Sequence, residues 1–170
     1  MGRRQGQVSG CLELSLPAER FEVSYREARG EQGDLLAESF SALLSKFADR
    51  REEGRIEARF VPETALWLVD GDTYLGRISI RHRLNESLRV LGGHIGYDIR
   101  PSRRGQGLGG AMLRLALPHA HALGVDPAML TCDTANIASW RMIERCGGTR
   151  ESTYMHDGVE RYRYWLPTTI

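Results

Sequence analysis

The chain has 170 residues, of which 41% are hydrophobic, so it can bury one substantial core and is too short for two ordinary domains. Its 23 basic and 22 acidic residues nearly cancel, and the net charge of +1 argues against nucleic-acid or membrane-surface binding as a property of the whole molecule. No apolar run reaches the roughly 18 residues that span a bilayer, and the first residues lack the apolar core of a secretory signal. We therefore expect a cytoplasmic protein.

The three cysteines, Cys11, Cys132 and Cys146, are odd in number and have no Cys-x-x-Cys spacing. They predict neither a disulfide framework nor a zinc site, and no metal is expected. Residues 1–10 are small and polar, which predicts a disordered N-terminus, and residues 11–170 are expected to form a single domain.

The first third of the chain predicts a short strand and two helices. Residues 11–16 alternate weakly and stop at Pro17, which indicates an extended segment. A first helix follows, and a second is predicted to begin at Asp34 as its N-cap. Apolar residues recur at helical spacing in both, at Phe21, Tyr25 and Ala28 and then at Leu36, Phe40, Leu43, Leu44 and Phe47. We expect this helical pair to cover a sheet or a site.

From residue 64 the hydrophobic period changes to two. Residues 64–69 and 74–80 predict two strands, and the Asp70-Gly71 pair between them is typical of a hairpin turn. Residues 81–91 have no clear period, which indicates a loop before a strand at residues 93–99.

A helix is predicted at residues 111–123, with a kink at Pro118 and a cap at Gly124. The next strand, at residues 129–132, is expected to pair parallel to residues 93–99 through a right-handed crossover. A further helix at residues 138–146 precedes a closing hairpin around Asp157 and Gly158. The order predicts an α/β fold with a single mixed, mostly antiparallel central sheet, one βαβ crossover and flanking helices.

The most informative segment is Arg104-Gly105-Gln106-Gly107-Leu108-Gly109-Gly110, placed where a strand ends and a helix begins. Glycines let the backbone approach a ligand closely, and the helix that follows offers unpaired N–H groups and a positive dipole end. Together with Arg100 and Arg103, the segment predicts a phosphate cradle. A Walker loop is excluded because no Gly-Lys-Ser/Thr follows, and a Rossmann site normally lies in the first βα turn of a longer chain.

The segment resembles the signature of the GNAT N-acetyltransferase superfamily, Arg/Gln-x-x-Gly-x-Gly/Ala, at Arg104, Gly107 and Gly109. Asn136, followed by Ser139 and Glu144 and then by Gly147 and Gly148, is similar to the family's second block. The resemblance covers about residues 64–166.

The resemblance implies a GNAT-like acyl-CoA N-acyltransferase fold and acetyl-CoA as the cosubstrate. The diphosphate would lie on the loop amides, the pantetheine arm between two strands that splay apart, and a backbone N–H between Tyr97 and Ile99 would meet the carbonyl oxyanion. The cosubstrate-binding residues so implied are Tyr97, Ile99, Arg100, Arg103, Arg104, Gly105, Gln106, Gly107, Leu108, Gly109, Gly110, Asn136 and Ser139.

Acetylation of an amine needs a base, because a primary amine titrates near pH 10. His94 is the leading candidate and Asp98 the second, with sheet packing and pairing with an arginine as their alternative roles. Many family members carry a Tyr acid seven residues after the Asn, where this chain has Ile143. Ser139 is the substitute by position, as in members with Ser in this block, and a capping role is its alternative.

The sequence thus predicts an acetyl-CoA-dependent N-acetyltransferase that acts on a primary amine of a small molecule or peptide by direct transfer in a ternary complex. The alternatives are a non-catalytic acyl-CoA sensor module, and an acyltransferase that uses a hydroxyl acceptor or a longer acyl donor. An acyl-enzyme at Cys132 is disfavoured, because no Cys–His–Asp arrangement is visible. The acceptor class is not ranked, and homodimer formation stays open because no interface is specified.

Overall fold

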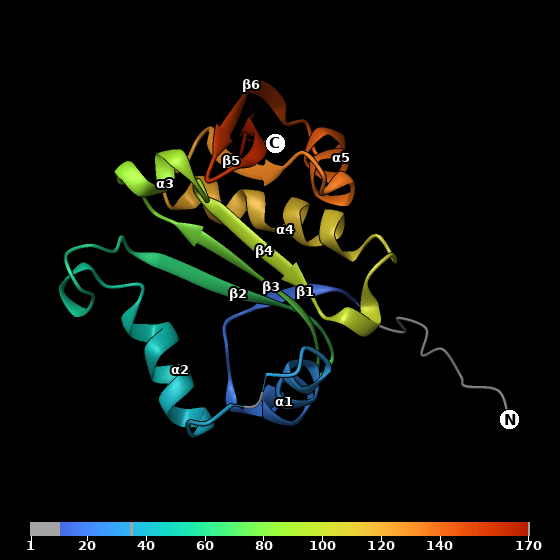
Figure 1. Cartoon of the computed structure of the whole chain (residues 1–170). Helices are drawn as coiled ribbons and strands as arrows, with labels where there is room; N and C mark the ends of the chain where they lie inside the picture. Colours follow the sequence, from blue (N-terminus) through green and yellow to red (C-terminus); the bar gives the residue numbers. More distant parts are fainter. Residues whose placement is uncertain (1–10, 35, 170) are drawn as a thin grey trace, which may run out of the picture.

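The computed structural model describes residues 11–34 and 36–169, and the N-terminus that the sequence predicts to be disordered, residues 1–10, lies outside them. The described chain forms a four-stranded sheet of order β1-β2-β3-β4 and a three-stranded sheet of order β5-β7-β6, with helices around them (Figure 1). The strands of the first sheet are β1 (Glu13–Ser15), β2 (Glu63–Asp70), β3 (Thr73–Arg81) and β4 (Ile95–Ile99). Those of the second sheet are β5 (Ala128–Asp133), β6 (Thr149–His156) and β7 (Val159–Leu166).

Both predicted hairpins are present. In the first, Asp70 pairs with Thr73, and the loop residue Gly71 adopts a φ of 56°. In the second, the two turn residues Asp157 and Gly158 have φ values of 50° and 73°. Positive φ at the turn suits the right-handed twist of the paired strands, which explains Gly71 in the first turn, whose residues are Gly71 and Asp72, and Asp157-Gly158 in the second.

The predicted parallel ladder between the strands on either side of the crossover is not formed. The segment just before β4 meets β5 at a single antiparallel bridge between Gly93 and Leu130, and beside it the His94 N–H donates to the Met129 carbonyl at 2.7 Å. Within the described residues, β4 forms a ladder with β3 alone, so the central sheet is divided here in two. The mixed α/β fold class is confirmed, and the division leaves the edge of β4 that faces away from β3 without a strand partner among the described residues.

Gly93 makes this bridge sterically feasible. Its φ is 66°, and a Cβ at this position would lie 2.3 Å from the Met129 carbonyl oxygen. Only a residue without a side chain can combine this φ with such a close approach between two backbones.

Helices cover the two faces of the four-stranded sheet differently. α4 (Leu108–Ala122) packs against both sheets, and its Met112, Leu113 and Ala116 are fully buried in the larger core. α1 (Glu22–Glu31) and α2 (Phe40–Asp49) lie on the opposite side of the four-stranded sheet (Figure 1). There they bury an aromatic cluster around Trp67, whose ring stacks on that of Tyr25 with 4.5 Å between ring centroids.

Two local predictions were wrong because short capped turns leave little periodicity in the sequence. α2 begins at Phe40, where the Ser39 hydroxyl caps it by accepting from the Ala42 N–H at 3.2 Å, and Asp34 pairs with Arg29 instead. The predicted loop at residues 81–91 contains the five-residue helix α3 (Glu86–Val90), capped by Asn85.

α4 continues through Pro118 without interruption, and Pro118 lies on the exposed side of this helix.

We predict that Gly93→Ala destabilises the protein much more than Gly124→Ala. Both place alanine at positive φ, which costs about 1–2 kcal/mol, but a Cβ at Gly124 meets nothing within 4 Å. The additional clash at Gly93 should lower the free energy of unfolding by a further ~2 kcal/mol or more, measured by denaturant titration. Equal losses for the two variants would show that the close approach at the bridge is not a constraint.

Candidate active site

A pocket of about 820 Å³ opens at the N-terminus of α4, between that helix and α5 (Ile137–Arg145). Its walls come from the end of β4, the glycine loop and the first turns of both helices. Eleven of the predicted cosubstrate-binding residues line it, namely Tyr97, Ile99, Arg103, Arg104, Gly105, Gly107, Leu108, Gly109, Gly110, Asn136 and Ser139. Two segments about 30 residues apart in the sequence thus form one site.

The N-terminus of α4 is built to meet an anion. Its N-cap is Gly107, with a φ of 77° and no side chain to cap the first turn, and the first turn carries no acidic residue. A Cβ at Gly105 or Gly107 would meet nothing within 4 Å, so the space in front of the loop is open. An uncapped helix N-terminus with space before it accommodates a phosphate group, which fits a diphosphate-bearing ligand.

Gly109 has a different role from the loop glycines. A Cβ at Gly109 would lie 2.9 Å from the Met142 Sδ atom on α5. This glycine therefore allows α4 and α5 to approach each other at the pocket floor, while Gly105 and Gly107 supply the left-handed backbone of the loop.

The pocket has a strong excess of positive charge. Five arginines and one carboxylate, Asp98, are among the described residues that line it; the arginines are Arg103, Arg104, Arg114, Arg141 and Arg145. Arg104 is oriented by its Nε, which donates to the Ile99 carbonyl at 2.9 Å. The sequence analysis did not include the last three arginines. The spacing of four between Arg141 and Arg145 would have placed them on one helix face.

Two predicted ligand-binding residues lie outside the lining. Gln106 is exposed at the tip of the loop, and Arg100 turns toward α1. The Arg100 Nε donates to Glu31 at 2.6 Å and its Nη2 to Glu27 at 3.3 Å, with the side chain only 12% exposed. Its charge is already neutralised, so Arg100 anchors the chain to α1 instead of facing the pocket. A contact between Arg100 and the cosubstrate stays a prediction.

The geometry also argues against His94 as the base. Its Nδ1 accepts a hydrogen bond from the Met129 N–H at 2.9 Å, so the neutral ring carries its proton on Nε2. Burial, together with the charges of Arg89 and Arg81, lowers the pKa of His94. Because the basic lone pair already holds β5 beside β4, a proton could bind there only by breaking this contact. The sheet role is therefore the one that the structure supports.

Asp98 is the remaining carboxylate candidate. It lines the large pocket, and Gln32 of the turn after α1 donates to its Oδ2 at 3.4 Å. Its cross-strand partner on β3 is Arg77, which lines a second pocket of about 600 Å³ between α1, α2 and β3. Asp98 thus lines the large pocket, and its neighbour across the β3–β4 pair lines the second one.

Ser139 is held from two directions. Asn136 caps α5 by accepting from the Ser139 N–H at 3.2 Å, and the Ser139 hydroxyl lies 2.6 Å from the Tyr97 hydroxyl. Ser139 is 9% exposed, and burial raises the pKa of Tyr97 to about 12. Ile143, one turn further along α5, is fully buried. The two hydroxyls form a pair at the pocket wall that the sequence analysis did not foresee.

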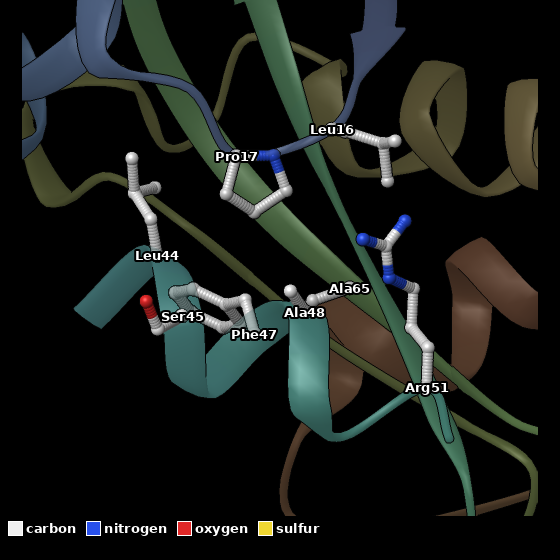
Figure 2. Close-up of a pocket in the computed structure, with 8 residues that line it drawn as sticks. All are labelled: Leu16, Pro17, Leu44, Ser45, Phe47, Ala48, Arg51 and Ala65. Atoms are coloured by element: carbon white, nitrogen blue, oxygen red, sulfur yellow. The ribbon is translucent and has the colours of Figure 1, made fainter. Parts of the chain in front are cut away.

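Two other features do not resemble a catalytic centre. Burial raises the pKa of the Cys132 thiol, which disfavours the nucleophilic thiolate. A smaller pocket of about 330 Å³ lies between α2, the segment after β1 and Ala65 of β2, and Figure 2 shows it lined mainly by apolar side chains with the guanidinium of Arg51 at its edge. The described residues that line it include one hydroxyl, that of Ser45, and no carboxylate, imidazole or thiol.

Within residues 11–34 and 36–169, no three His, Cys, Asp or Glu side chains gather as they would around a metal ion. The helices in the same part of the chain are too short or too polar to cross a membrane.

A divided α/β sheet, an uncapped helix N-terminus behind a glycine loop and an arginine-lined pocket together fit a transferase that binds a phosphate-bearing cosubstrate. The chain belongs to the acetyltransferase (GNAT) domain family, whose sequence model matches residues 51–149, more than half of its length. The predicted family is thereby confirmed. No curated protein matches the sequence.

Solved structures share the fold over almost their whole length. One is an acetyltransferase from Salmonella typhimurium that modifies the N-terminal serine of ribosomal protein L7/L12, with 18% identity, 95% of this chain and 97% of that chain covered, and a TM-score of 0.63. A spermidine/spermine N-acetyltransferase from Vibrio cholerae, in mutant forms, has 17% identity, coverages of 93% and 95%, and a TM-score of 0.61. The microcin C7 self-immunity acetyltransferase in complex with acetyl-CoA and AMP has 16% identity, coverages of 94% and 94%, and a TM-score of 0.65. At these identities the likeness establishes the fold.

We predict that His94→Asn flattens the pH dependence of stability. Folding lowers the pKa of His94 below its unfolded value near 6.5. The contribution of His94 to the free energy of unfolding is therefore complete above pH 6.5 and is lost as the pH falls through the lower pKa of the folded state. The carboxamide oxygen of the substituted asparagine can still accept from Met129 without titrating. Denaturant titrations at pH 7.5, 6.5 and 5.5 should show that the variant loses less unfolding free energy than the wild type as the pH falls. The loss that remains in the variant includes a contribution from His82, because burial also lowers the pKa of His82. Identical losses in both proteins would contradict the assigned role.

Proposed function

We propose that residues 11–170 act as one acetyltransferase domain that binds acetyl-CoA and transfers its acetyl group directly to a primary amine in a ternary complex. The observation that carries the proposal is the arginine-lined pocket, which runs from the uncapped N-terminus of α4 to Asp98 and Ser139. The family assignment and the acetyl-CoA in the complex of a structural neighbour support it.

The charge of the pocket suits acetyl-CoA, which carries a diphosphate and a further phosphate. The first-turn N–H groups of α4 would bind the diphosphate, and the arginines of α4 and α5 would meet the remaining charge. Tyr97, Ile99 and Met142 offer apolar surface for the pantetheine arm. Asn136 and Ser139 close the pocket at the start of α5.

The unpartnered edge of β4 offers hydrogen-bond donors to the reacting carbonyl. The Arg100 N–H donates to the Leu75 carbonyl at 2.9 Å, toward β3. Because N–H groups alternate in direction along an antiparallel pair, those of Tyr97 and Ile99 point the other way. A backbone donor at this edge would stabilise the oxyanion that forms when the amine attacks, an effect typically worth 10²–10³ in rate.

Asp98 is the residue that we assign to the acceptor amine. Its carboxylate would attract an ammonium group and accept its proton, directly or through one water. The neutral nitrogen then attacks the thioester carbon, the carbon–sulfur bond breaks, and CoA leaves as a thiolate. The pocket between α1, α2 and β3 supplies an approach for the acceptor from the side of Arg77.

The identity of the acceptor stays open. The neighbours include an enzyme that acts on spermidine and spermine and one that acts on a protein N-terminal serine, which supports an amine acceptor without choosing between these classes. The non-catalytic sensor, the hydroxyl acceptor and the longer acyl donor remain as alternatives. The cytoplasmic location and the homodimer also stay predictions.

The test is continuous detection of CoA thiol release from acetyl-CoA with polyamines, amino acids, aminoglycosides and short peptides as acceptors. Release that requires one acceptor class and yields the acetylated amine by mass spectrometry would support the proposal. Binding of acetyl-CoA by calorimetry without release across this panel would favour the sensor. Absence of acetyl-CoA binding would overturn the proposal.

We predict that Arg141→Gln with Arg145→Gln weakens acetyl-CoA binding by about tenfold or more, since two charge-assisted contacts to phosphate would be lost. Acetyl-pantetheine carries no adenosine phosphates, so its KM should hardly change in the same variant. Arg150→Gln on β6 serves as the control, because Arg150 lies over the Tyr162 ring and outside the pocket lining. An equal effect on acetyl-CoA and acetyl-pantetheine would show that these arginines do not bind phosphate.

A further inference from the structure

Arg77 on β3 is a half-buried cation without a carboxylate partner. No carboxylate oxygen of the described residues lies within 4.0 Å of its side-chain nitrogens, although Asp98 is its direct neighbour across the β3–β4 pair. Asp98 likewise forms no ion pair with any residue in the described part of the chain. Cross-strand neighbours of opposite charge attract each other, so two that remain unpaired are available to a ligand that carries both charges.

We propose that the acceptor is an α-amino acid, whose carboxylate binds to Arg77 while its ammonium group lies at Asp98. Residues directly opposite each other in an antiparallel pair have Cβ atoms roughly 5 Å apart, which suits a ligand whose two charges are separated by a single carbon atom. This inference rests on the proposed function and names the acceptor class that the site selects.

Two buried phenols lie near both charged groups. Tyr25 and Tyr74 are 4% and 5% exposed, and Tyr25 lines the pocket of about 600 Å³ together with Arg77. Burial raises the pKa of both phenols, the charge of Arg77 opposes this rise, and the charge of Asp98 adds to it. Neither hydroxyl forms a hydrogen bond within the described residues. A bound carboxylate would give the Tyr25 hydroxyl an acceptor that it otherwise lacks.

The charge of this pocket disfavours a polycation. The described ionisable side chains that line it are four cations and two carboxylates, besides the phenol of Tyr25, namely Arg29, Lys46, Arg50 and Arg77 against Asp34 and Glu38. Three of the four cations form ion pairs, whereas Arg77 does not. A polyamine would therefore meet a net positive surface, and an anionic group would meet an available guanidinium.

Apolar side chains form the rest of the pocket lining. Leu36 and Leu43 are half-buried there, and Phe47 lies beside them on α2. These groups offer contacts to an apolar side chain next to the amine and the carboxylate. We therefore expect leucine, methionine and phenylalanine to be better acceptors than aspartate or lysine.

The transfer leaves the carboxylate of the acceptor unchanged. The ammonium group loses one proton to Asp98, directly or through one water, and the neutral nitrogen attacks the thioester carbon. The carbon–nitrogen bond forms and the carbon–sulfur bond breaks. CoA leaves as a thiolate, which takes up a proton as the nitrogen loses its second one. The products are an N-acetylated amino acid with one negative charge, CoA and one proton, so atoms and charges balance.

The experiment compares the kcat/KM of L-leucine, L-methionine and L-phenylalanine with the values for their amides and for spermidine, by CoA thiol release at saturating acetyl-CoA. An amide keeps the amine and the side chain but has no negative charge, as at a peptide N-terminus. Each acceptor is measured at the pH of its own maximal rate, because the amines differ in basicity. Charge-assisted hydrogen bonds to Arg77 should make each acid an about 10- to 100-fold better acceptor than its amide.

Arg77→Gln tests the assigned residue. The ratio of the acid value to the amide value should fall to within about threefold of one, and Arg77→Lys should keep part of the preference, since lysine retains the charge without the planar fork. The Kd of acetyl-CoA, measured by calorimetry, should stay within about twofold in both variants, because Arg77 lies outside the lining of the large pocket. A merely structural role would lower kcat/KM for acids and amides alike.

Arg83→Gln is the matched control. Arg83 follows β3, forms an ion pair with Glu53 and lies outside the lining of both pockets. The variant makes the same change in charge, and its ratio of acid to amide should equal that of the wild type.

The outcomes separate the two proposals. If acetyl-CoA does not bind, or binds without release to any of these acceptors, the proposed function fails and the acceptor class fails with it. If release is equal for acids and amides, is faster with spermidine, or keeps its preference for acids in Arg77→Gln, the α-amino acid assignment is wrong while the acetyltransferase assignment stands.

Discussion

The contact between Gly93 and the backbone of β5 is the constraint on which the site depends. The Met129 carbonyl oxygen lies 2.3 Å from where a Gly93 Cβ would be, so the two backbones come close at this point, at one isolated bridge. The His94 side chain secures this close approach through the Met129 N–H. Because β4 forms no ladder with β5 among the described residues, its free edge, α4 and α5 together leave the space in which the pocket forms.

Charge is distributed so that the site stays positive. Arg100 is surrounded by Glu27 and Glu31, and this network fixes the chain before the glycine loop to α1. Burial of Glu31 opposes ionisation, but the hydrogen bonds from Ser102 and Arg100 outweigh it and lower the pKa of Glu31, which keeps the anchor ionised. The arginines that line the pocket face a single carboxylate among its described residues. Glu27 and Glu31 of α1 hold Arg100 away from the pocket, so α1 separates this anchoring arginine from the arginines that line the pocket.

Neighbouring side chains of β4 point to opposite faces of the sheet. Asp98 lies on the face toward α1 and α2, whereas Tyr97 points toward α4 and α5, where Ser139 meets it. Alternation along one strand therefore places Asp98 and Tyr97 on opposite faces of the sheet, although both residues contribute to the lining of the large pocket. The N–H groups of Tyr97 and Ile99 lie in the plane of the sheet, on the edge away from β3.

The sequence by itself determined the hairpins and the glycine loop before α4, because each depends on local backbone chemistry, namely positive φ at Gly71, Gly107 and Gly158. It did not determine which charged or polar side chain faces the pocket. His94 and Arg100 have suitable residue types, yet their partners, Met129 and Glu31, lie 35 and 69 residues away. Arg141, Arg145 and the Tyr97–Ser139 pair came together only when α5 packed beside α4. Long-range packing decided these roles, since a hydrogen bond to a distant residue leaves no periodicity in the sequence.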